Sequence, residues 1–167
     1  MKSLQIPLWI VAVFLITSLS IEPDDRDQTA YVPILMKKSE LPASVFMQEA
    51  REFETPGKIY IYGNKIYVVD LFKGIHIIDN QDPSNPQKTG FLHIPGVMDL
   101  AIRNQVLYAD NSIDLVSIDI SSYPQISILD RLAEVFPEPT PPDLDWIPWS
   151  YSAHRRPENT VIVAWVK

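Results

Sequence analysis

The 167-residue chain is 46% hydrophobic, which is enough for one domain with a buried core and excludes a disordered polymer. Its 21 acidic and 14 basic residues leave a net charge of −7, so a nucleic-acid backbone is repelled and no nucleic-acid partner is expected. Fifteen prolines against five glycines favour short extended segments separated by turns, and the absence of cysteine excludes disulfides, thiolate zinc sites, a thiol nucleophile and a lipid-bearing N-terminal cysteine.

Residues 1–20 have the pattern of a secretory signal peptide. One lysine precedes an apolar run, which ends in the small-x-small sequence Ser18-Leu19-Ser20. We expect cleavage after Ser20 and an extracytoplasmic location, in the periplasm, on the outer surface or secreted, in a bacterium. The alternative is an uncleaved anchor, but the apolar run is shorter than the roughly 20 residues that cross a bilayer. Contact with a membrane is expected only through this segment.

Residues 21–55 form a lead-in that includes a partial blade. The first ten are acidic and polar without periodicity, which is typical of a tether. Two interpretations of residues 31–54 stay open. Val45, Phe46, Glu49, Ala50 and Phe53 fit a helical stripe, whereas Val45, Met47 and Glu49 alternate as in a strand.

From residue 56 the sequence indicates strands. Four alternating apolar runs are predicted as strands in a first repeat, residues 56–94, at residues 59–62, 65–70, 74–79 and 88–94. Gly63-Asn64 stands where a two-residue hairpin turn is needed, because glycine tolerates the positive φ of such a turn.

A second repeat, residues 95–132, follows the first at a spacing near 40 residues. Asn64 matches Asn104, Asp70 matches Asp110 and Asp79 matches Asp119. In each copy Asp and Pro residues are expected to shape the turn after the third strand. These structural turn positions are Asp79, Asp82, Pro83, Pro86, Asp119 and Pro124. The pattern predicts an all-β fold of tandem four-stranded antiparallel blades of a β-propeller type, forming an incomplete propeller.

The repeats "KIYVVDLFKGIHIIDNQDPSNPQ" and "VLYADNSIDLVSIDISSYPQ" resemble those of the LVIVD-repeat family. The resemblance is strong over residues 56–137 and weak in the flanks. It implies a β-propeller-like extracytoplasmic protein, and many members of this family are bacterial lipoproteins. The chain differs from the family pattern in lacking a lipobox cysteine and in having two clear repeats where more are usual.

Two repeats are few, because each blade buries its faces against neighbouring blades. Truncation of a longer protein, self-association through exposed blade faces, or additional strands from the flanks each resolve the shortage, and we favour truncation. Residues 160–167 read as a terminal strand.

Residues 133–159 are a connector rich in proline and tryptophan. Candidate binding residues here are Trp146, Trp149, His154, Arg155 and Arg156. The tryptophans suit a carbohydrate or protein partner of the cell envelope, although packing of the loop against the sheet explains them more simply. The basic residues suit an anion, although a solvated loop is the simpler interpretation.

No catalytic or metal site is expected. Motifs for acyl transfer, zinc hydrolysis, phosphate binding and dinucleotide binding are absent. The three histidines His76, His93 and His154 are isolated in the sequence. Five aspartates recur at strand ends, which indicates turn capping and not a calcium site; they are Asp70, Asp79, Asp110, Asp114 and Asp119. We therefore expect a binding or scaffolding module without a cofactor. The alternatives are an extracytoplasmic hydrolase with a site at the blade loops and a remnant of a longer propeller protein.

Overall fold

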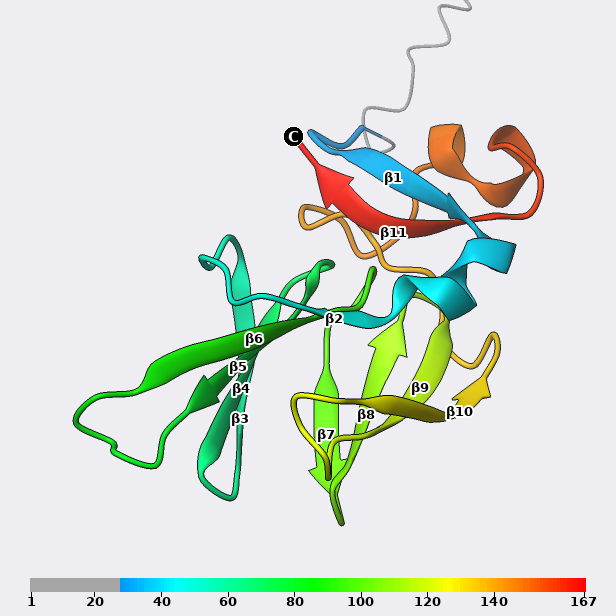
Figure 1. Ribbon diagram of the computed structural model, residues 1–167. Coiled ribbons are helices and arrows are strands. Elements are labelled where there is room, and N and C mark those ends of the chain that lie inside the picture. Colours follow the sequence, from blue (N-terminus) through cyan, green and yellow to red (C-terminus); the bar gives the residue numbers. More distant parts are fainter. Residues whose placement is uncertain (1–27) are drawn as a thin grey trace, which may run out of the picture.

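The computed structural model describes residues 28–167, so the predicted signal peptide lies outside the described residues. These residues form an all-β fold with three antiparallel sheets (Figure 1). Between residues 28 and 167 no helix is long and apolar enough to cross a membrane.

The first sheet has five strands in the order β2-β6-β5-β4-β3. Its strands are β2 (Phe46–Gln48), β3 (Pro56–Tyr62), β4 (Lys65–Asp70), β5 (Gly74–Asp79) and β6 (Gln87–His93). The predicted hairpin turn at Gly63-Asn64 is present, with Tyr62 opposite Lys65 and a φ of 60° at Gly63. β2 settles the two interpretations of residues 31–54 in favour of a strand, because Phe46, Met47 and Gln48 pair with β6.

The second sheet has four strands in the order β10-β9-β8-β7. They are β7 (Leu100–Arg103), β8 (Val106–Asn111), β9 (Asp114–Asp119) and β10 (Ser127–Leu132). The sheets of the described part of the chain are therefore not uniformly four-stranded, because β2 adds a fifth strand to one of them, and they do not close into a ring.

The third sheet pairs β1 (Val32–Lys37) with β11 (Thr160–Val166). This pair lies at one end of the two larger sheets (Figure 1). The part of the chain that the structure describes also contains three 3-10 helices, at Lys38–Ser44, Trp149–Tyr151 and Ala153–Arg155.

The two larger sheets repeat the same irregularities. In both, the outer strand carries a bulge at an equivalent place, since Thr89 in β6 and Leu129 in β10 are skipped in the pairing. Asp79 and Asp119 end the third strands and each carboxylate accepts a backbone N–H two residues on, from Gln81 at 2.9 Å and from Ser121 at 2.8 Å. Their similar surroundings fit a duplicated unit.

The second strands, β4 and β8, match with an offset one residue larger than predicted, whereas the third strands keep the predicted offset. β4 and β5 are joined by residues 71–73, so that Asp70 pairs with Gly74, whereas β8 and β9 are joined by residues 112–113, so that Asn111 pairs with Asp114. By strand register the counterpart of Asp70 is thus Asn111 and not Asp110. In their hydrogen bonds Asp70 and Asp110 nevertheless agree with the prediction, because each accepts two successive backbone N–H groups from the residues just before β3 or β7. The match of Asn64 with Asn104 shifts in the same way, because the second hairpin turn is Asn104-Gln105. Both shifts arise because the turn at residues 112–113 is one residue shorter than the turn at residues 71–73.

One hydrophobic core joins the first two sheets. Tyr67, Val69 and Ile75 of the first sheet belong to the same buried cluster as Leu107 and Val116 of the second. A smaller cluster holds the third sheet in place and consists of Leu41, Ile113, Val161 and Val163.

Burial along the strands shows which faces are covered. Residues 67–70 of β4 and 74–77 of β5 are buried without alternation, so both faces of the first sheet are covered at its centre. In β9, buried residues alternate with half-buried ones. The second sheet therefore has one well-covered face and one that is only partly covered.

Candidate functional site

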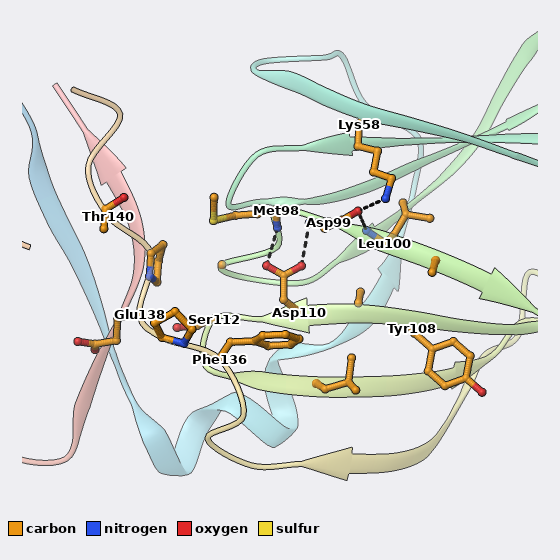
Figure 2. A pocket seen from close by; sticks show the side chains of 16 residues that line it. Lys58, Met98, Asp99, Leu100, Tyr108, Asp110, Ser112, Phe136, Glu138 and Thr140 are labelled. Atoms are coloured by element: carbon orange, nitrogen blue, oxygen red, sulfur yellow. Dashed lines mark hydrogen bonds and ion pairs between the residues drawn. The ribbon is translucent and has the colours of Figure 1, made fainter. Parts of the chain in front are cut away.

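A cavity of about 500 Å³ lies over the partly covered face of the second sheet (Figure 2). Its walls come from the start of β3, from β7 and the loop before it, from β8 and the start of β9, and from the connector at residues 136–140. The lining residues are Lys58, Gly96, Met98, Asp99, Leu100, Ala101, Tyr108, Ala109, Asp110, Ser112, Leu115, Phe136, Pro137, Glu138, Pro139 and Thr140. Most of these side chains are apolar, which is typical of a ligand pocket of this size.

The cavity occupies a position that packing fills in the first repeat. By the observed register, Ala101, Tyr108 and Leu115 correspond to Tyr60, Tyr67 and Ile75. Tyr67 and Ile75 are buried in the core between the two larger sheets, and Tyr60 packs against that core. In the second repeat no further sheet covers this face of the described chain, and the connector roofs only part of it.

Most polar groups of the cavity wall are bound to other protein groups. The Ser112 hydroxyl donates to the Ile162 carbonyl at 2.7 Å. Glu138 accepts from the Ile162 N–H at 3.0 Å and forms an ion pair with Arg156 at 2.7 Å. Lys58 forms an ion pair with Asp99 at the rim, which Figure 2 shows as a dashed line.

Asp110 is the carboxylate of the wall that has no cationic partner within the described residues. Its two oxygens accept the backbone N–H groups of Met98 and Asp99, each at 2.8 Å. Burial raises the pKa of the Asp110 carboxyl above its ordinary value of 3.8, and the N–H groups of Asp99 and Met98 oppose this rise. The cavity therefore holds a half-buried acidic group beside an apolar space.

The predicted binding residues lie elsewhere, in the connector. Trp146 and Trp149 are 48% and 62% exposed, so a large part of each ring is accessible to a partner. The Arg155 guanidinium stacks over the Trp149 ring at 3.3 Å from its centroid. His154 is exposed in the same short helix.

Arg156 does not belong to that exposed surface. Its side chain is buried and bound to Glu138, and its Nε and Nη1 atoms have no hydrogen-bond partner in the described part of the chain. The ion pair attaches the last turn of the connector to the segment that roofs the cavity. Arg156 thus has a structural contact in this structure, whereas Arg155 and the two tryptophans face solvent.

The histidines have separate surroundings. His76 Nε2 donates to Asp70 Oδ2 at 3.1 Å, and both side chains are buried. The rings of Phe53 and Phe91 lie 4.2 and 4.8 Å from the His76 ring and seal the pair from solvent. His93 stacks on Phe46. Among residues 28–167 no group of three or more His, Cys, Asp or Glu side chains is arranged to hold a metal ion.

The aspartates at strand ends bind backbone groups, as expected for turn and loop capping. Asp82 accepts from the Ser84 N–H at 3.0 Å, and Asp70 accepts from the N–H groups of Glu54 and Thr55 at 3.1 and 2.6 Å. Asp114 instead pairs with Arg131 at 2.8 Å. Pro83, Pro86 and Pro124 lie in the segments that join the third and fourth strands.

Sequence reasoning missed the cavity because its walls come from three separate segments. A signal exists in the substitutions between the repeats, where Ala101 replaces Tyr60 and Asp110 replaces Val69. This signal can be recognised only when β4 is aligned with β8 at the offset that the structure shows. Comparison with known proteins found no matching family model, no matching curated protein and no matching solved structure.

Proposed function

We propose that this protein is an exported binding module and that the cavity over the second sheet is its ligand site. The observation that carries the proposal is the arrangement of an apolar space beside walls whose polar groups, Asp110 apart, are largely bound to one another. Such a wall offers water few hydrogen-bonding groups, so replacing that water with an apolar ligand group is favourable. No reaction is assigned, because the buried His76–Asp70 pair has no access to solvent.

The finer architecture belongs to the same proposal. The two larger sheets represent tandem blades of a β-propeller type, related to LVIVD repeats and forming an incomplete propeller. The shared bulges and the equivalent Asp79 and Asp119 turns support this relation. Residues 1–20 act as the signal peptide, which places the mature chain outside the cytoplasm of a bacterium.

A larger envelope partner, a protein or a glycan, contacts the connector in this proposal. Exposed Trp146 and Trp149 support it, since flat aromatic rings stack well on partner surfaces and Arg155 already lies against one of them. Self-association through exposed blade faces is the other expected contact. The edge strand β3 exposes Ile59 and Ile61 at 64% and 67%, on the face of the first sheet opposite Tyr60, which packs against the core.

Binding of a neutral apolar dye tests the cavity. Nile red is expected to gain fluorescence with the wild-type chain and to lose that gain with Ala101→Trp, because an indole at this exposed wall position fills the space. Ala43→Trp is the matched control, since Ala43 is exposed in the 3-10 helix Lys38–Ser44 and does not line the cavity. A folded wild-type chain that does not bind the dye, or equal binding by wild type and Ala101→Trp, contradicts the proposal.

A further inference from the structure

The charges around the cavity do not balance. Lys58 and Asp99 neutralise each other at the rim, and Glu138 is neutralised by Arg156 behind the wall. Asp110 remains, and its carboxylate accepts hydrogen bonds from backbone N–H groups without a cationic partner in the described chain. The wall of the cavity therefore has an excess of one negative charge.

Asp110 can also accept hydrogen bonds from a ligand in the cavity. A carboxylate oxygen has two lone pairs, so each Asp110 oxygen can accept a second hydrogen bond in addition to its backbone N–H. The side chain lies in the middle of the cavity wall, with Thr140 towards one end and Tyr108 towards the other in Figure 2. A group that binds at Asp110 thus lies within the cavity, whose lining is mostly apolar.

The rest of the wall suits the remainder of such a ligand. Leu115 and Ala101 offer an aliphatic surface, and the Phe136 and Tyr108 rings offer faces that attract a cation as well as apolar groups. A carboxylate or phosphate would instead lie next to Asp110 without a free cation to compensate for the repulsion.

We propose that the cavity selects apolar amines, that is, a protonated amino group held at Asp110 with a hydrocarbon body along Leu115 and Tyr108. This inference rests on the proposed binding function and names its ligand class. A charge-assisted hydrogen bond to the carboxylate supplies the selectivity over a neutral analogue, and the hydrocarbon body supplies most of the remaining affinity.

Three probes of equal chain length test the selectivity by isothermal titration calorimetry at pH 7. Octylamine is expected to bind about tenfold more tightly than 1-octanol, because a hydrogen bond to a charged group is usually worth about that much. Octanoate is expected to bind more weakly than both, because its carboxylate is repelled by Asp110. Equal affinity for the three probes overturns the amine inference but leaves the apolar binding site intact. No binding of any probe by the folded chain overturns both.

A variant that adds a charge to the wall tests the inference without replacing Asp110. Replacement of Asp110 would also disturb residues 98–99, whose N–H groups it binds. Met98 is exposed on the cavity wall, so Met98→Lys adds a cation there without burying it. It is expected to abolish the preference for octylamine over octanoate, because one added cation balances the charge of Asp110, whereas the neutral control Met98→Gln keeps the wild-type preference. An unchanged preference in a folded Met98→Lys variant overturns the inference, and thermal unfolding of each variant verifies the fold.

Discussion

Single aspartates have different roles in this fold, and burial decides which. Asp79, Asp82 and Asp119 lie at the surface and stabilise turns through N–H groups two residues further along the chain. Asp70 is fully buried and binds His76 together with two backbone N–H groups. The sequence indicates that Asp70, Asp79 and Asp119 end strands and that Asp82 lies in a turn, but it does not separate the buried carboxylate from the exposed ones.

The pKa shifts of Asp110 and Asp119 have opposite signs and give opposite pH dependence. Burial raises the pKa of Asp110, so its protonated form is favoured in the folded state. Its contribution to the free energy of unfolding therefore falls as pH rises from about 3.8 to the raised pKa, and is constant above that value. The backbone N–H of Ser121 lowers the pKa of Asp119, so its stabilisation is present above 3.8 and is lost as pH falls through the lowered pKa.

Urea unfolding between pH 2.5 and about 7 measures both effects, over a range set by the ordinary carboxyl pKa. Relative to Asp110→Asn, the wild type is expected to lose stability as pH rises through the window above 3.8. Relative to Asp119→Asn, it is expected to gain stability as pH rises towards 3.8. A pH-independent difference for Asp110→Asn would show that its pKa is the same in both states.

At the scale of strands and turns, the sequence predicts most of the second, third and fourth strands of each repeat. Alternating apolar residues and the turns at Gly63 and Asp79 are local signals, so they survive without tertiary information. The prediction fails where the partner is remote. β2 pairs with β6 more than 40 residues later in the chain, and no local pattern distinguishes that strand from a helix.

The cavity could not be predicted for a related reason. The turn after Asn111 is one residue shorter than the turn after Asp70, and the step of one residue exchanges the two faces of a strand. A simple 40-residue alignment matches Val69 with Ala109 and places both in the core. The observed register matches Val69 with Asp110 at the cavity wall.

Gly74 is the position at which a strand is most sensitive to a side chain. A Cβ at this position would collide with the Leu92 carbonyl oxygen and lie 2.5 Å from the Phe91 ring. We expect Gly74→Ala to lower the free energy of unfolding by about 3 kcal/mol, as for an overpacked core. Urea denaturation provides the measurement.

Gly63→Ala is the matched control for Gly74→Ala. Nothing lies within 4 Å of a Cβ at Gly63, so only its φ of +60° opposes alanine. The expected loss is about 1 kcal/mol, from the strain of a left-handed residue. Equal losses for the two variants would mean that the packing around Gly74 relaxes freely.

At the scale of the whole molecule, the described chain leaves several sheet edges unpaired and one face of the second sheet only partly covered. The second sheet is held to the third by the Ser112 bond to Ile162 of β11. Arg131 of β10 binds Asp114 and Asn111 within the second sheet and joins this sheet to the 3-10 helix Lys38–Ser44 through the Leu41 carbonyl. At the other side of the molecule, β3 remains an open edge.

Light scattering after size exclusion tests the proposed self-association at that edge. The wild-type chain is expected to form dimers at high concentration, and Ile61→Lys to shift it to monomers, because a charge on an exposed edge strand opposes pairing. Ile61→Val keeps the apolar, β-branched character and is expected to behave as wild type. A monomeric wild type at every concentration would refute self-association.

The pairing of β1 with β11 also sets the order in which the chain can fold. β1 leaves the ribosome early, but its partner strand is synthesised only after both larger sheets are complete. The small cluster around Leu41 and Ile113 must wait as well, since Val161 and Val163 complete it. Long-range contacts of this kind form late, so the nascent polypeptide keeps an unpaired apolar strand until residues 160–166 have been made. A chaperone that recognises extended apolar segments would find its target in residues 32–37.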